Sequence, residues 1–98
     1  GARLNEAQEK AKLLALDGTD QRLAALLLDL AERSGVQDPQ GIRLAVRLTR
    51  QDMADMIGTT TETAIRIMSR FKKQHLVSGT ANRLVIRDLA RLKAFASA

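Results

Sequence analysis

The chain contains 98 residues, of which 45% are hydrophobic and 2% aromatic, and it carries a formal net charge of +5. This length suffices for one small domain with a single hydrophobic core. Because the sequence contains no cysteine, it excludes disulfides, thiolate metal sites and thiol catalysis. No apolar run approaches the roughly 18 residues of a membrane-spanning helix, so we expect no membrane partner.

The positive charge is concentrated in the C-terminal two-thirds of the chain. Residues 1–34 carry 5 basic and 6 acidic groups, whereas residues 35–98 carry 11 basic and 5 acidic groups. This asymmetry indicates a polyanion-binding surface, although a merely basic, well-solvated surface would have the same charge. The scarcity of aromatic residues argues against single-stranded nucleic acids and RNA, whose bases stack on aromatic rings. Duplex DNA needs no such rings.

The first predicted helix covers residues 3–16. Its small and apolar residues recur at the alternating three- and four-residue spacing of a coiled-coil seam. These residues are Leu4, Ala7, Ala11 and Leu14. Two heptads are too short to hold a coiled coil alone, and a helix that packs on its own domain would show the same pattern. The abrupt helical start at Gly1, without an initiator methionine, suggests a fragment of a longer protein.

A second helix is expected after a break at Asp17 and Gly18, with Thr19 or Asp20 as its cap and Gly35 as its end. Four leucines at helical spacing predict the stripe that faces the core. They are Leu23, Leu26, Leu27 and Leu30.

A turn at residues 38–41 precedes the alternating stretch RLAVRL, residues 43–48. Leu44, Val46 and Leu48 would share one face of a strand, with the arginines on the other face. This alternation predicts a half-buried strand.

Two short helices follow this strand. Thr49 begins a capping-box pattern, and the first helix ends at Gly58, where a left-handed backbone costs little. Thr59 or Thr60 caps the second helix, which continues to about Gln74.

The remaining residues predict a hairpin and a last helix. Two short apolar runs flank residues 78–82, which is typical of a β-hairpin. Asp88 can cap a final helix that reaches Phe95.

The two short helices match a helix-turn-helix. Ala54 supplies the small residue that a close approach of the helices requires, and Gly58 supplies the sharp turn. The shared core is expected from Met53, Ile57, Ala64, Ile67, Met68 and Phe71. A general helical hairpin would meet some of these conditions, whereas all of them together favour a helix-turn-helix.

The longer of these two helices also has a polar face. At helical spacing, Glu62, Arg66, Ser69 and Lys73 lie opposite the core residues, with Ile65 beside them. A solvated face would show the same polarity. In a major groove, however, an isoleucine can contact the thymine methyl, an arginine can bind O6 and N7 of guanine, and a glutamate can accept from N4 of cytosine. Because a carboxylate would only repel phosphates, this mixture favours base reading.

The stretch LTRQDMADMIGTTTETAIRIMSRFKKQHLV and the hairpin after it resemble the C-terminal winged-helix domain of the Crp/Fnr family of bacterial transcription regulators. The resemblance covers about residues 17–87. It implies an α+β, mainly helical fold, a winged helix-turn-helix in which a helical bundle carries a small antiparallel sheet with a wing. Residues 1–17 would be the C-terminal end of the dimerisation helix with its hinge, and residues 18–98 the DNA-binding domain. An effector-sensing domain would precede them, and no cofactor is expected in this chain.

The resemblance also implies roles for individual residues. The base-reading residues would be Glu62, Arg66, Ile65 and Thr61. The cyclic-AMP receptor branch has an arginine at the position of Thr61, and the Fnr branch has a serine at that of Ile65, so only the shared G·C contact of Glu62 and Arg66 is carried over. The phosphate-binding residues would be Arg50, Gln51, Thr60, Thr63, Thr80 and Asn82, with Ser69 and Lys73 from the polar face.

We therefore predict sequence-specific binding of double-stranded DNA by a homodimer, with residues 60–74 in the major groove of a palindromic operator. The expected location is the bacterial cytoplasm, at the nucleoid. Residues 36–42 occupy the place where some family members contact RNA polymerase, although a plain surface turn is the other interpretation. A winged helix that binds protein without reading DNA is the alternative function.

An enzyme is not expected. The only histidine, His75, lies near a helix end, where capping of carbonyl groups accounts for it, and no metal-ligand cluster or activated nucleophile is visible. The basic residues that either contact the DNA backbone or are solvated charges are Lys72, Lys73, Arg83 and Arg87.

Overall fold

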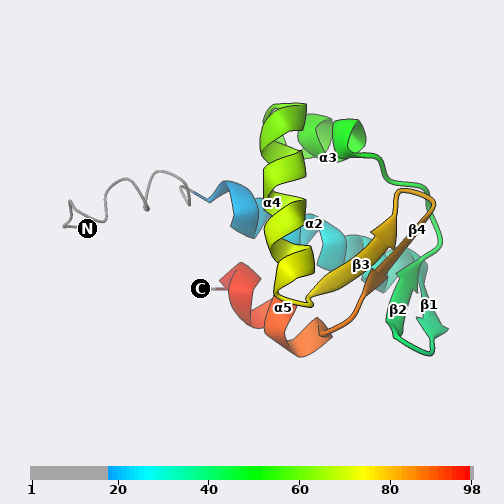
Figure 1. The fold of residues 1–98 in the computed structure, drawn as a ribbon. Coiled ribbons are helices and arrows are strands. Elements are labelled where there is room, and N and C mark those ends of the chain that lie inside the picture. Colours follow the sequence, from blue (N-terminus) through cyan, green and yellow to red (C-terminus); the bar gives the residue numbers. More distant parts are fainter. Residues whose placement is uncertain (1–17, 98) are drawn as a thin grey trace.

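The computed structural model describes residues 18–97 (Figure 1). Its elements in chain order are α2 (Thr19–Ser34), β1 (Gly35–Asp38), β2 (Gly41–Leu44), α3 (Arg50–Ile57), α4 (Thr61–Lys73), β3 (Val77–Thr80), β4 (Arg83–Ile86) and α5 (Leu89–Ser97). The predicted dimerisation segment, with Leu4, Ala7, Ala11 and Leu14, lies outside the described residues. What is described is a mainly helical α+β domain, as predicted.

The strands form one antiparallel sheet in the order β1-β2-β4-β3. β1 and β2 make one hairpin, and β3 and β4 make a second hairpin, residues 77–86, which we call the wing. Ile42 of β2 pairs with Ile86 of β4 and so joins the two hairpins. In Figure 1 the sheet lies to one side of the helices, with β3 and α4 both towards the viewer. This is the predicted arrangement of a helix-turn-helix with a wing.

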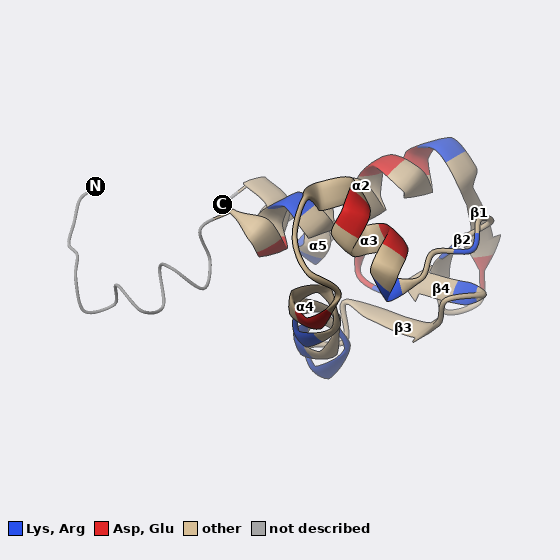
Figure 2. Cartoon of the chain, turned by 90° about the horizontal axis from the view of Figure 1, so that it is seen from above, with Lys and Arg blue, Asp and Glu red and all other residues tan. Residues whose placement is uncertain are grey.

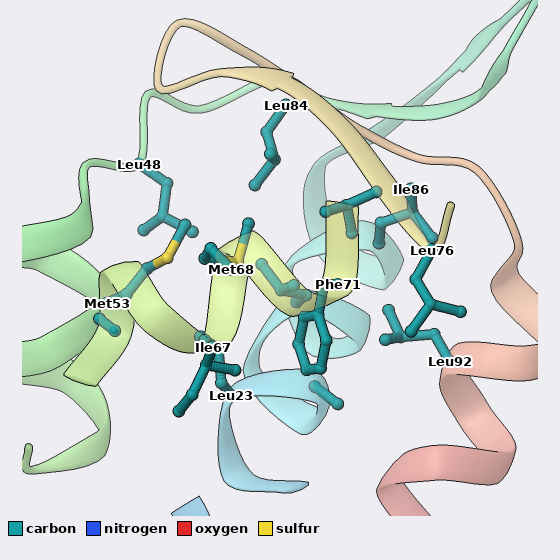
Figure 3. Close-up of a cluster of buried hydrophobic side chains, with 14 of the residues drawn as sticks. Leu23, Leu48, Met53, Ile67, Met68, Phe71, Leu76, Leu84, Ile86 and Leu92 are labelled. Atoms are coloured by element: carbon teal, nitrogen blue, oxygen red, sulfur yellow. The ribbon is translucent and has the colours of Figure 1, made fainter. Parts of the chain in front are cut away.

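The hydrophobic core surrounds the inner face of α4. Ile67, Met68 and Phe71 of this helix are at most 2% exposed. Figure 3 shows them among side chains from the other helices and from β4. These neighbours include Leu23, Leu27, Met53, Leu84, Ile86 and Leu92. Since burial of one such side chain contributes about 1.5–3 kcal/mol, several elements hold α4 independently. The predicted core is confirmed except for three residues that are only partly buried and pack against it, namely Leu26, Leu30 and Ile57.

The predicted strand at residues 43–48 is wrong in its second half. β2 ends at Leu44, which pairs with Gly35 of β1, and the stretch that forms β1 shows no hydrophobic alternation that could have predicted it. Val46 is 37% exposed. Leu48 is buried because the chain turns back against the wing at that point. Alternation of apolar residues therefore predicts the burial of Leu44 and Leu48 correctly, but it does not predict the backbone conformation between them.

The start of α2 also differs from the prediction. The helix begins at Thr19, and Gly18 is its N-cap residue, with a left-handed φ of 101°. Asp20 does not cap the helix but lies in its first turn, fully buried, with its carboxylate against Arg70 of α4. A partner from a distant helix thus replaces the local capping role that the sequence suggested.

α3 begins with the predicted capping box. Thr49 Oγ1 accepts from the backbone N–H of Asp52, and the Asp52 carboxylate accepts from the backbone N–H of Thr49, both at 3.0 Å. Hydrogen bonding to the Asp52 carboxyl from the backbone N–H and the side chain of Thr49, together with the positive charge of Arg47, holds the pKa of this carboxyl below its ordinary value. The box satisfies N–H groups that have no partner inside the helix.

The turn between α3 and α4 follows the sequence prediction closely. Gly58 ends α3 with a left-handed φ of 77°, and its N–H donates to the Ala54 carbonyl (2.9 Å). Thr60, rather than Thr59, caps α4, because its hydroxyl accepts from the N–H of Thr63 (3.1 Å). These three local features set the angle between the two helices.

We expect Gly58→Ala to destabilise the domain by about 1 kcal/mol, because the left-handed region is strained for a residue with a β-carbon. A β-carbon at Gly58 would have no neighbouring atom within 4 Å, so a steric clash adds nothing to this loss. Urea denaturation followed by circular dichroism measures it. Gly58→Asn is the matched control and should lose less, since asparagine tolerates this region. Equal losses in both variants would contradict the backbone explanation.

Candidate nucleic-acid interface

The outer face of α4 consists of the residues that the core leaves accessible. Glu62, Arg66, Ser69 and Lys73 are exposed, and Ile65 beside them is 49% exposed. Figure 2 shows α4 end-on, with its basic residues on the side turned away from the other helices. We call this surface, formed by these five residues, the reading face. It presents a carboxylate, a branched alkyl group and a guanidinium together, as the sequence predicts.

One flank of α4 is held by the first turn of α2. Arg70 Nη2 lies 2.7 Å from Asp20 Oδ2, and the second Asp20 oxygen has no hydrogen-bond partner among the described residues. From the same turn of α2, Arg22 donates to the carbonyl of Ile57, at the end of α3, from Nε (3.3 Å) and Nη2 (3.1 Å). The first turn of α2 therefore contacts both helices of the helix-turn-helix.

The other flank of α4 is held by α3. The Thr61 hydroxyl donates to Gln51 Oε1 (2.7 Å), and Gln51 Nε2 donates to Asp55 Oδ1 (2.9 Å). A residue predicted to read bases and a residue predicted to bind phosphate are thus bonded to each other. This contact could not be predicted from sequence, because Thr61 lies 10 positions after Gln51 and beyond a turn.

The start of each helix carries further residues predicted to bind phosphate. Arg50 is the first residue of α3, and its partial burial lowers the pKa of its guanidinium from the ordinary value. Arginine stays charged at neutral pH even so. The hydroxyl of Thr60 donates to that of Thr63 (3.0 Å) while it accepts the N-cap bond. Both threonines therefore stabilise α4 before any ligand is present.

The wing tip is joined to the segment before α3. Thr80 and Asn82, predicted to bind phosphate, are exposed. Arg47 Nε donates to Asn82 Oδ1 (2.9 Å), and the N–H of Leu48 donates to the carbonyl of Ala81 (2.9 Å). α4 and the wing lie on the same side of the domain in both views (Figures 1 and 2).

Arg47 is a candidate that the sequence prediction missed. The strand predicted at residues 43–48 placed it among solvated arginines, whereas the fold brings its guanidinium to the wing tip beside Asn82. Of the four undecided basic residues, Arg83 is bonded to the nearly buried carboxylate of Asp38 (2.8 Å) and so links the two hairpins. Lys72 and Arg87 are exposed.

Residues 18–97 contain neither a cluster of metal ligands nor a membrane-spanning helix. In this range no three His, Cys, Asp or Glu side chains gather where they could hold a metal ion. Nor does the range include a helix that is long and apolar enough to cross a membrane. His75 ends α4 through its backbone, which is left-handed (φ 60°) and donates its N–H to the carbonyl of Lys72 (3.0 Å).

Two helices joined by a tight turn, with the second helix exposed and a hairpin wing on the same side, define a winged helix-turn-helix, a class of DNA-binding domain. Residues 21–95 match the family described as the Crp-like helix-turn-helix domain. The chain therefore belongs to the Crp/Fnr family of bacterial transcription regulators, which are not enzymes.

Similar proteins agree with this assignment. The nitrogen fixation regulation protein FixK of Azorhizobium caulinodans is 34% identical over 94 residues, which cover 94% of this chain and 38% of FixK. The cAMP-activated global transcriptional regulator CRP of Pasteurella multocida is 32% identical over 83 residues, covering 84% of this chain and 38% of CRP. The CO-dependent transcription factor CooA of Carboxydothermus hydrogenoformans superposes with a TM-score of 0.79 at 32% identity, over 88% of this chain and 40% of CooA. The chain spans about two fifths of these relatives.

Arg70→Met should destabilise the domain by roughly 2–3 kcal/mol, because it leaves the fully buried Asp20 carboxylate without a partner. This value lies below that for a wholly buried pair, since the Arg70 side chain is 43% exposed. Arg33→Met is the matched control, because it removes the exposed i,i+4 pair with Asp29 and should cost about 0.5 kcal/mol or less. Urea denaturation measures both.

The double variant Asp20→Asn/Arg70→Met tests the explanation directly. It removes the buried charge together with its partner, so it should be more stable than Arg70→Met alone. A double variant no more stable than the single one would show that Arg70 acts through packing of its alkyl chain instead.

Proposed function

We propose that this domain binds duplex DNA sequence-specifically, with α4 in the major groove of a palindromic operator. The observation that carries the proposal is the reading face, where Glu62, Ile65 and Arg66 are exposed together on a helix whose opposite side is buried. Membership of a DNA-binding family supports the same role.

Each group of the reading face suits a different base edge. The Arg66 guanidinium can donate two parallel hydrogen bonds to O6 and N7 of guanine, and the Glu62 carboxylate can accept from N4 of cytosine. Ile65 can contact the methyl group of thymine. Because Ile65 is 49% exposed, its burial against a base would remove apolar surface from water and favour binding.

Phosphate contacts would come from the edges of this surface. We assign them to the residues predicted from the sequence and to Arg47, which the fold places at the wing tip. The full set is Arg47, Arg50, Gln51, Thr60, Thr63, Ser69, Lys73, Thr80 and Asn82. These contacts would position α4 in the groove without selecting a sequence.

The assembly would be a homodimer with two-fold symmetry, formed through the dimerisation segment predicted at residues 1–17. Each reading face would then enter a major groove, with half-sites one helical turn, roughly 34 Å, apart. The β1–β2 hairpin includes Val36 of β1, which is 40% exposed, and is a candidate contact for RNA polymerase. The bacterial cytoplasm, at the nucleoid, is the location this function requires.

One observation favours the alternative, a winged helix that binds protein. Val46 and Met56 are both exposed and line a shallow groove of about 320 Å³ that also includes Leu30 and Leu48. This groove lies between α2, α3 and the loop before α3, and it contains no residue of the reading face. A protein contact there is compatible with DNA binding by α4.

A salt titration separates the two functions. If the dimer contacts about six to ten phosphates, its affinity for duplex DNA should fall roughly 10³- to 10⁵-fold between about 50 and 200 mM salt. Fluorescence anisotropy with a random duplex measures this dependence. An affinity that is unchanged over this range would contradict phosphate binding and favour the protein-binding alternative.

Arg66→Ala tests base reading. On an operator selected from a random duplex pool, we expect a loss of about 1–3 kcal/mol in binding free energy and a weaker preference at one base pair, because the contact with guanine is lost. Affinity for scrambled duplex DNA should change less. Lys73→Ala is the control, since loss of a phosphate contact weakens binding to all sequences alike. If Arg66→Ala behaves as Lys73→Ala does, Arg66 does not read a base.

A further inference from the structure

Three polar side chains form a chain of hydrogen bonds across the junction of α3 and α4. Thr61 is the first residue of α4, and its Oγ1 lies 2.7 Å from Oε1 of Gln51. Gln51 Nε2 lies 2.9 Å from Oδ1 of Asp55, one turn further along α3. Gln51 and Asp55 are exposed and Thr61 is only half-buried, so burial in the core does not account for this arrangement.

The chemistry of these groups sets the direction of every bond in the chain. A carboxylate accepts hydrogen bonds and donates none, so Asp55 requires that Gln51 turn its NH₂ group towards it. The amide oxygen of Gln51 then faces Thr61 and can only accept. The single hydroxyl proton of Thr61 must therefore point at Gln51, away from a ligand in the groove.

The position of Thr61 makes this direction relevant to DNA. Thr61 lies one helical turn before Ile65, so the two residues are neighbours on the same side of α4. Thr61 is half-buried against α3 and still partly accessible. What it offers a ligand is the lone pairs of its hydroxyl oxygen and its methyl group.

We infer that Asp55 and Gln51 are positioning residues that make Thr61 a hydrogen-bond acceptor for one base pair of the operator. This inference rests on the proposed function and adds a base preference to it. In the major groove adenine and cytosine present an amino donor, whereas guanine and thymine present a carbonyl acceptor. On the strand that Thr61 reaches, the domain discriminates adenine and cytosine from guanine and thymine.

A threonine without these partners would not discriminate in this way. Its hydroxyl group can rotate to donate to a carbonyl or to accept from an amino group, so threonine is compatible with either kind of base. The discrimination therefore arises from the α3 residues, although neither of them touches the base. Gln51 keeps its second amide hydrogen, which can still bind a phosphate.

The experiment begins with selection of bound sites from a random duplex pool by the wild-type chain. Affinities are then measured for four duplexes that carry each base pair in turn, at every position of the selected site. The position that Thr61 faces is the one at which Thr61→Val changes the order of the four affinities. At this position the wild type should bind the two amino-bearing bases about three- to tenfold more tightly than the two keto-bearing bases, as expected for one neutral hydrogen bond.

Variants of the positioning residues test the mechanism. Gln51→Leu removes the oxygen that accepts the hydrogen bond of the Thr61 hydroxyl. The ratio of the affinities for amino-bearing and keto-bearing bases should therefore fall to about one. Asp55→Ala lets the Gln51 amide adopt either orientation, so the ratio should fall part of the way. The preference for guanine at the base pair read by Arg66 serves as the internal control and should persist in all these variants. Its persistence would show that α4 still docks in the groove and that only the hydrogen-bonding preference of Thr61 has changed.

The outcomes are distinct for the two proposals. If the wild type selects no sequence, the proposed function and this inference are both overturned. If the wild type selects a site but shows no amino preference at the Thr61 position, or keeps the full preference in Gln51→Leu, only this inference is overturned. A preference kept in Asp55→Ala would remove Asp55 from the mechanism and contradict its role as stated.

Discussion

Burial of Ile67, Met68 and Phe71 fixes the rotation of α4 about its own axis, because no other rotation would place these side chains in the core. The helical period then decides which residues point outward. Glu62 and Arg66 lie on the outer side for this reason, and no local feature of their own holds them there. The reading face is therefore a consequence of core packing, and a change that allowed α4 to rotate would alter every contact on it at once.

α4 and the wing are each held by a second kind of contact. Arg70 bonds Asp20 across 50 residues of sequence, and Arg47 bonds Asn82 across 35 residues. Each bond joins two elements that the hydrophobic core alone leaves free to shift slightly, since apolar contacts have no direction. Because charge-assisted hydrogen bonds are directional, the first bond orients α4 against α2, and the second orients the wing tip against the segment before α3.

The polar residues around α4 have internal partners as well as accessible surface. Thr60 caps the helix and bonds Thr63, while Gln51 is shared between Thr61 and Asp55. These internal bonds restrict which hydrogen-bonding group each side chain offers to DNA, and they hold the side chains in place before DNA arrives. Such preorganisation reduces the conformational entropy lost on binding.

Local signals in the sequence determined much of this domain. Thr49, Gly58 and Thr60 each specify the backbone within a few residues, so the helix-turn-helix could be placed from its capping box, its left-handed glycine and its second cap. The helical spacing of Ile67, Met68 and Phe71 predicted the inner face of α4 and, with it, the exposure of Ile65. These features depend on neighbours in the chain, which is why the sequence alone was sufficient.

Only the tertiary structure decided the contacts between distant segments. The β1 strand has no pattern of its own and exists because β2 pairs with it, and Val46 lies outside the sheet because that pairing ends at Leu44. Asp20 had the sequence position of a cap, yet its carboxylate is buried against α4. The partners of Arg47 and Thr61 were equally invisible in the sequence, because hydrogen bonds between side chains depend on distances that arise only when the core brings separate elements together.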